Sequence, residues 1–187
     1  MPRMPSPTVT TAEQLLALHE PGWRHELVRG EVLRMSPSGP VHGLVAGRIT
    51  RLLANHVEEH DLGGVFAADA GFVLARDPDT VRAPDVGFVQ KDRLLSSYPR
   101  GFFPGPPDLA IEVTSPGDSF PEVHEKARCW IAHGTRLVWV VDPMARRVSG
   151  YRTLEAARLL GPGDELDGGD VVPGFRVRVR DLFPDGT

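Results

Sequence analysis

The sequence has a single cysteine, so it cannot form an internal disulfide bond. It also lacks any run of about 18 to 20 apolar residues, the length that a helix needs to cross a bilayer. Its first residues lack the apolar core of a signal peptide. These absences exclude a disulfide-stapled fold and a membrane span, and they predict a cytoplasmic protein.

An excess of positive charge is absent too. The 21 Lys and Arg residues face 25 Asp and Glu residues, which leaves a formal net charge of −4. Such a chain has no overall cationic field to draw it onto nucleic acid or anionic lipid. Any contact with nucleic acid must therefore come from a local group of residues.

Lysine is scarce, because only Lys91 and Lys126 accompany 19 arginines. An ammonium group is compact and its pKa shifts readily, whereas a guanidinium group is a wide planar fork. A lysine in such an arginine-rich chain is therefore a hint that its position needs a compact cation.

The length and composition fit one domain. A chain of 187 residues, 41% of them hydrophobic, can build a core of its own. Its 20 glycines and 18 prolines predict many tight turns. We predict a flexible segment over residues 1–10 and a single domain over residues 11–187.

Helix signals occur at three places. Residues 11–14 have capping-box spacing and begin a short helix that runs to about Pro21. Apolar residues at helical spacing predict a long helix over about 41–60. A further helix is predicted from the N-cap Ser119 to a C-cap at Gly134.

Strand signals fill the rest of the chain. The middle of the chain reads helix, strand, strand, strand, helix, strand, which is typical of an α/β fold with a mixed sheet flanked by helices. Additional β-hairpins are expected at both ends. The predicted strands are a hairpin over 25–35 with its turn at Arg29-Gly30, adjacent strands over 65–75 and 84–90 with a turn at 77–79 between them, a central strand over 108–115 buried on both faces, a strand over 136–143, and hairpin-like segments over 146–153 and 170–183.

Two carboxylates fall on neighbouring predicted strands. Asp85 begins one strand, and Glu112 lies on the face of the next strand that carries only Ala110 and Thr114 beside it. An unpaired buried carboxylate costs several kcal/mol, so Glu112 should meet a cation, hydrogen-bond donors or a metal. If the strands pair with Asp85 opposite Glu112, the carboxylates lie within about 5–8 Å and can share one Mg²⁺ or Mn²⁺ ion.

Lys126 is the third candidate. It lies beside the apolar stripe of the last predicted helix, from which its stem can reach over the edge of the sheet. A cation near two carboxylates and a metal could position an attacking water or stabilise a phosphate transition state.

These residues lie within segments that resemble the PD-(D/E)XK nuclease superfamily and, within it, the Uma-type restriction endonuclease family. The resemblance spans most of the chain and implies a restriction endonuclease-like αβββαβ core, with Asp85 and Glu112 as metal ligands and Lys126 as the lysine. The usual lysine two residues after the glutamate is replaced by Thr114, and Trp130 stands where tyrosine is usual. The segments are, in order, HELVRGEV, MSPSGPVHG, APDVGFV, PPDLAIEVTSP, EKARCWIAHG and VWVVDP.

Three other residues could surround this site. His42 begins the long helix, where its imidazole could face a phosphate or a metal-bound water, and we include it among the catalytic candidates. The hairpin could bring Glu26 or Glu31 to the rim of the site. Surface charges flanking a turn would explain these two residues equally well.

Each of the three candidate residues could instead have a purely structural role. Asp85 could cap a turn at the start of its strand. Glu112 could form a buried ion pair with Arg128 or Lys126. Lys126 could be a solvated helix residue paired with Glu122.

The residues and the resemblance together predict a Mg²⁺-dependent endonuclease that hydrolyses DNA phosphodiester bonds. Mn²⁺ could substitute for Mg²⁺, and neither an organic cofactor nor a membrane is expected. The catalytic residues would be Asp85, Glu112, Lys126 and His42. We expect a homodimer, because so small a domain offers little surface for gripping duplex DNA. The alternatives are an inactive member that binds nucleic acid or protein, and a structural protein whose carboxylates are merely paired in its core.

Overall fold

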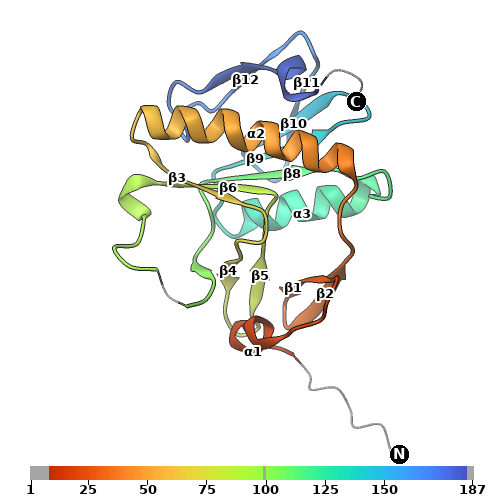
Figure 1. Ribbon diagram of the computed structural model, residues 1–187, viewed down its shortest axis with the longest axis vertical. Coiled ribbons are helices and arrows are strands. Elements are labelled where there is room, and N and C mark those ends of the chain that lie inside the picture. The colour runs from red at the N-terminus through yellow and green to blue at the C-terminus, as the bar shows by residue number, and fades with distance from the viewer. Residues whose placement is uncertain (1–8, 99, 185–187) are drawn as a thin grey trace, which may run out of the picture.

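The computed structural model describes residues 9–98 and 100–184 (Figure 1). Most of the segment predicted to be flexible therefore lies outside the described residues. The elements are α1 (Ala12–Ala17), β1 (Arg24–Val28), β2 (Glu31–Met35), α2 (Pro40–Glu59), β3 (Gly63–Ala67), β4 (Phe72–Ala75), β5 (Thr80–Arg82), β6 (Val86–Gln90), η1 (Lys91–Arg93), β7 (Phe103–Pro104), β8 (Leu109–Val113), α3 (Phe120–Ala132), β9 (Leu137–Asp142), β10 (Arg147–Tyr151), β11 (Ala157–Leu160), β12 (Glu165–Asp167), β13 (Arg176–Arg178) and η2 (Val179–Leu182).

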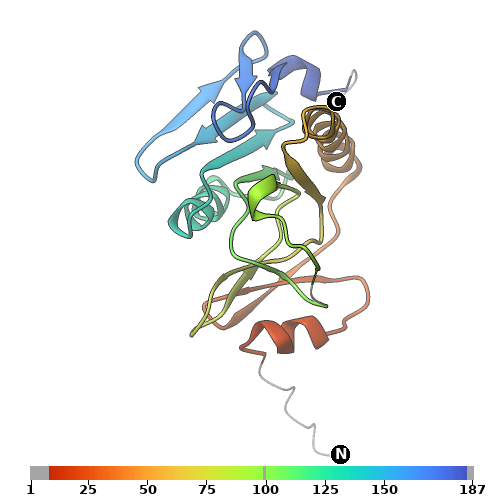
Figure 2. The same ribbon diagram turned by 90° about the vertical axis from the view of Figure 1, so that its left-hand side faces the viewer.

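The main sheet has the strand order β11-β10-β9-β8-β6-β3 and is mixed, because β8 pairs parallel with β9 and antiparallel with β6. Figure 2 shows α2 and α3 on opposite sides of this sheet. Ile111 of β8 belongs to one core cluster with Ile49 and Leu53 of α2. Ala110 belongs to a second cluster with Trp130 of α3. The strand β8 is therefore central and buried on both faces, as predicted.

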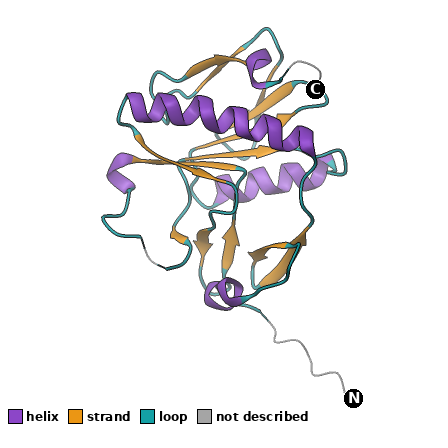
Figure 3. Cartoon of the chain, viewed as in Figure 1, coloured by secondary structure: helices purple, strands orange, loops and turns teal. Residues whose placement is uncertain are grey.

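A second sheet has the order β2-β1-β5-β4-β7 and lies with α1 below the main sheet in Figures 1 and 3. The hairpin β1–β2 turns at Arg29 and Gly30, whose φ angles of 51° and 77° suit a two-residue turn between twisted strands. Val81 of β5 pairs with Leu27 of β1. The hairpin is thereby fixed beside the segment that leads into β6.

The predicted order of helix, three strands, helix and strand is confirmed by α2, β3, β6, β8, α3 and β9. Three of the predicted elements differ from the structure. Residues 65–75 are not one strand, because a turn in which Asp69 has a φ of +74° separates β3 in the main sheet from β4 in the second sheet. Residues 170–183 contain β13, which pairs with the earlier strand β12, and the short helix η2. The helix α1 ends at Ala17, earlier than predicted.

Within the described ranges, no helix combines the length and the apolar character needed to cross a membrane.

Candidate functional site

The pairing of β6 with β8 determines the position of the two acids. Val86 pairs with Ile111, so the antiparallel register places Asp85 opposite Glu112 one residue further on. A carboxylate oxygen of Asp85, Oδ2, accepts a hydrogen bond of 2.8 Å from the backbone N–H of Val113. The register predicted from the sequence, with Asp85 opposite Glu112, is therefore confirmed. This hydrogen bond runs across the sheet, so Asp85 does more than cap a turn.

Two side chains of α3 contact the carboxylate of Glu112. Trp130 Nε1 donates a hydrogen bond of 2.7 Å to Glu112 Oε1, and Lys126 Nζ lies 2.8 Å from Oε2. Lys126 and Trp130 are four residues apart, so both project from one side of the helix. The helix therefore holds both oxygens of a carboxylate that is only 6% exposed.

The surroundings of Glu112 and Lys126 shift the pKa values of both side chains. Burial, together with the charges of Asp85 and Glu26, raises the pKa of Glu112 to about 7 despite the opposing effect of Lys126. Burial lowers the pKa of Lys126, but the charges of Glu112 and Glu26 outweigh this effect and hold that pKa above its usual range. At neutral pH the site thus holds a cationic lysine beside a glutamate close to its own titration point.

Glu26 reaches the same place from the second sheet. Its Oε1 accepts a hydrogen bond of 3.0 Å from the backbone N–H of Ala83 and lies 3.6 Å from Lys126 Nζ. Its Oε2 accepts a hydrogen bond of 2.8 Å from Arg82. Glu26 is 1% exposed, so its interpretation as a surface charge is wrong, whereas Glu31 lies exposed on β2.

His42, in the first turn of α2, completes the group. Its Nε2 lies 3.1 Å from Asp85 Oδ2. Burial opposes ionisation of Asp85, but the hydrogen bond and charge of His42 and the N–H of Val113 hold the pKa of this carboxyl below its usual range. Asp85 is therefore the more strongly ionised acid of the facing pair.

The structure thus brings together the four residues named from the sequence, Asp85, Glu112, Lys126 and His42. Lys126 is not a solvated partner of Glu122, whose carboxylate instead accepts hydrogen bonds from Ser119 in the N-terminal cap of α3. The ion pair between Glu112 and Lys126, foreseen as one alternative, is present.

Sequence reasoning missed the contributions of Arg82 and Trp130. Trp130 has a signal, since a buried indole N–H needs an acceptor and Trp130 lies one turn after Lys126. Arg82 is 7% exposed, and the other residues of its strand β5 are buried too. A buried arginine needs a carboxylate partner, so an arginine next to apolar Val81 is the signal that could have identified it.

The donor set fits a hard dication. Asp85 and Glu112 place two carboxylates at neighbouring positions of adjacent strands, although Trp130 and Lys126 already contact the two oxygens of Glu112. Mg²⁺ is usually bound through one or two carboxylates while it keeps several waters. The repulsion among Asp85, Glu112 and Glu26 would be relieved by a further cation. Among the residues that the structure describes, no group of three or more His, Cys, Asp or Glu side chains is arranged to hold a metal ion, so at most two protein carboxylates are available here. Water and substrate oxygens would therefore have to supply the other ligands.

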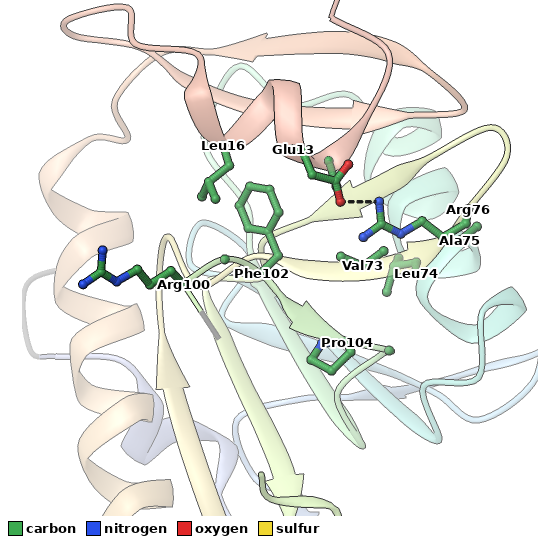
Figure 4. A pocket seen from close by; sticks show the side chains of 12 residues that line it. Glu13, Leu16, Val73, Leu74, Ala75, Arg76, Arg100, Phe102 and Pro104 are labelled. Atoms are coloured by element: carbon green, nitrogen blue, oxygen red, sulfur yellow. Dashed lines mark ion pairs between the residues drawn. The ribbon is translucent and has the colours of Figure 1, made fainter. Parts of the chain in front are cut away.

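A cavity of about 560 Å³ lies elsewhere, between α1, β4 and residues 100–105 (Figure 4). Its wall is largely apolar, with Leu16 and Phe102 facing each other, and Glu13 and Arg76 form an ion pair of 2.9 Å at its edge. The described residues that line it include none of the four site candidates. This cavity is therefore separate from the acid pair.

Comparison with known proteins agrees with this fold. No curated protein matches the chain. The crystal structure of a "putative nuclease belonging to DUF820" from Anabaena variabilis is 21% identical, with a TM-score of 0.78 over 92% of this chain and 97% of that chain, and shows that the two share a fold. The family model Uma2, described as "Putative restriction endonuclease", matches residues 12–180. Because this match spans most of the chain, the protein belongs to the Uma2 family.

Proposed function

We propose that the protein is a Mg²⁺-dependent endonuclease that hydrolyses phosphodiester bonds of DNA. Membership of the Uma2 family supports a hydrolase of nuclease type. The observation that carries the proposal is the register of β6 and β8, which sets Asp85 opposite Glu112, with Lys126 Nζ 2.8 Å from the glutamate.

Asp85 and Glu112 would hold the metal. When bound, Mg²⁺ lowers the pKa of a coordinated water and neutralises charge that develops on the phosphate; Mn²⁺ can supply the same chemistry. His42 acts as a positioning residue, because its hydrogen bond orients the carboxylate of Asp85 and favours its ionised form.

Lys126 acts on the reacting groups. Its ammonium can orient the attacking water and stabilise negative charge on a non-bridging phosphate oxygen. The water oxygen forms a bond to phosphorus and loses a proton, one ester P–O bond breaks, and the leaving oxygen takes up a proton, so that overall one water molecule is consumed. Glu26 and Glu112 contact the ammonium from two sheets and restrict its position.

A nicking assay tests this proposal. Supercoiled plasmid is incubated with Mg²⁺ or Mn²⁺ and with the wild type, Asp85→Ala or Lys126→Ala. We expect nicking by the wild type and its loss in both variants and in chelator. Equal nicking by all three proteins would reveal a contaminating nuclease and contradict the proposal.

The second candidate function is a nucleic-acid or protein binding module without catalysis. It is favoured by the fact that Trp130 and Lys126 already engage the two oxygens of Glu112. A wild type that binds DNA, neither binds Mn²⁺ nor nicks plasmid, and keeps its fold would be a module of this kind.

A further inference from the structure

A cavity of about 580 Å³ adjoins the acid pair. Asp85 and His42 lie in its wall, and so do Trp23 and Arg24, at the entry to β1. It lies beside the N-terminal half of α2. Figure 1 shows the chain rising from β2 to the start of this helix. A volume of this size suits a small-molecule ligand, for which the usual range is about 300–1,000 Å³. A substrate at the acid pair therefore has room to extend into this cavity.

Trp23 gives this cavity an aromatic wall. It is 41% exposed, whereas the other two tryptophans, Trp130 and Trp139, are buried. The guanidinium of Arg34 lies 3.7 Å from the centroid of the Trp23 ring and holds the ring in place by a cation–π contact. Trp23 lines the same cavity as Asp85 and His42. An aromatic platform thus lies in the wall of the cavity that also includes Asp85, one member of the acid pair.

The side of the cavity formed by α2 is open. Gly43 and Gly47 both line it, and a Cβ atom added at either position would meet nothing within 4 Å. Ala46 and Thr50 continue this wall of small residues. The volume is therefore free to receive a group that packs against the small residues of α2, in a cavity whose wall also includes the indole ring of Trp23.

The charges at the cavity favour a base over a phosphate. Both basic residues in its wall already have a carboxylate partner, since Arg24 pairs with Asp69 at 3.2 Å and His42 with Asp85 at 3.1 Å. A phosphate would find little uncompensated positive charge there. A nucleobase needs an aromatic face and an apolar slot, which the cavity provides.

We infer that this cavity holds an unstacked nucleobase of the DNA strand, next to the phosphate at the acid pair, with Trp23 as its stacking platform. The inference rests on the proposed function and adds that the substrate is DNA with unpaired bases at the cut. A base that enters the cavity has left the duplex stack, so single strands bind better than an intact duplex.

The experiment measures binding in chelator, where hydrolysis cannot occur. A labelled oligothymidylate is titrated with the wild type, Trp23→Ala, Trp23→Phe, Gly47→Leu and Asn55→Leu, and fluorescence anisotropy gives the affinities. We expect Trp23→Ala to weaken binding roughly tenfold and Trp23→Phe to restore most of it, because stacking survives with the smaller ring. A strand of the same length without bases should bind as weakly to the wild type as the oligothymidylate binds to Trp23→Ala.

Gly47→Leu fills the cavity without disturbing the core and replaces a residue that disfavours helix. It should lose binding with no loss of stability, whereas Asn55→Leu, on an exposed part of the same helix, should bind like the wild type. Equal affinity of the wild type, Trp23→Ala and Gly47→Leu, including no binding by any of them, overturns the inference. Plasmid nicking that depends on Asp85 but not on Trp23 also overturns it, while leaving the proposed function intact.

Discussion

At the scale of single residues, the main feature of the site is that several charged side chains are buried together. Three carboxylates, those of Glu26, Asp85 and Glu112, lie within reach of one ammonium, that of Lys126. The strand pattern could predict Asp85 and Glu112, because an acid in an apolar strand demands a partner. It could not predict that Glu26 faces inward, since the packing of the hairpin against the main sheet decides which of its faces is buried.

Removing Lys126 should destabilise the protein at neutral pH and above. Lys126→Ala leaves the buried carboxylates without their cation, which costs about 3–5 kcal/mol of the free energy of unfolding in comparable buried pairs. Urea unfolding measures this loss. The chain offers a control in its other lysine, because Lys91 forms a surface pair with Asp61 and Lys91→Ala should cost less than about 1 kcal/mol. Similar losses in the two variants would show that Lys126 lies outside the buried network.

The pKa of Glu112 predicts a pH dependence. Its pKa is raised from 4.5 to about 7 in the folded protein, so the folded state holds the proton of Glu112 more tightly than the unfolded state does. The stability that comes from this protonated carboxyl is complete below pH 4.5 and is lost as the pH rises through about 7. The loss is on the order of a few kcal/mol. Glu112→Gln removes this titration, so the difference in unfolding free energy between wild type and variant should change over that window. A constant difference from pH 4.5 to pH 8 would contradict the shift, and Glu31→Gln, an exposed change, serves as the control.

At the scale of elements, capping and periodicity predicted the helices well. The predicted capping box of Thr11 with Gln14 is formed, and the predicted N-cap Ser119 forms a capping box with Glu122. The strand prediction over residues 65–75 failed because apolar residues continue on both sides of Asp69, and the turn there is determined by which sheet each half joins. Short apolar runs show that a strand exists but do not show its partner.

The cap of α3 should affect activity as well as stability. Ser119→Ala removes the hydrogen bonds that begin the helix carrying Lys126 and Trp130, and a lost cap costs about 1 kcal/mol. Thr11→Ala removes the corresponding cap of α1, which carries none of the site residues. We expect both variants to lose similar stability in thermal unfolding, and only Ser119→Ala to lose nicking activity. Equal activity of the two variants would show that the start of α3 does not position the lysine.

At the scale of the whole molecule, the site lies where two sheets and two helices meet. The main sheet supplies Glu112, the segment entering it supplies Asp85, α3 supplies Lys126, α2 supplies His42 and the second sheet supplies Glu26. The αβββαβ order was predictable because each element carries its own periodicity. The second sheet was not, because it is formed by short strands that pair across long separations in the sequence.

The homodimer predicted from the sequence remains a prediction. A domain of this size that acts on DNA gains contact surface by pairing with a second copy. Sedimentation equilibrium of the full chain should give a mass of about twice 20.4 kDa. A mass of a single chain at all concentrations tested would contradict it, without affecting the acid pair itself.

The most direct test of the central claim is calorimetric titration of the full chain with Mn²⁺ at a pH above 7. We predict saturable binding by the wild type, loss of that binding in Asp85→Ala and Glu112→Gln, and unchanged binding in Glu31→Gln. Binding that is absent from the folded wild type, or that survives in both site variants, would contradict the claim that Asp85 and Glu112 hold a dication.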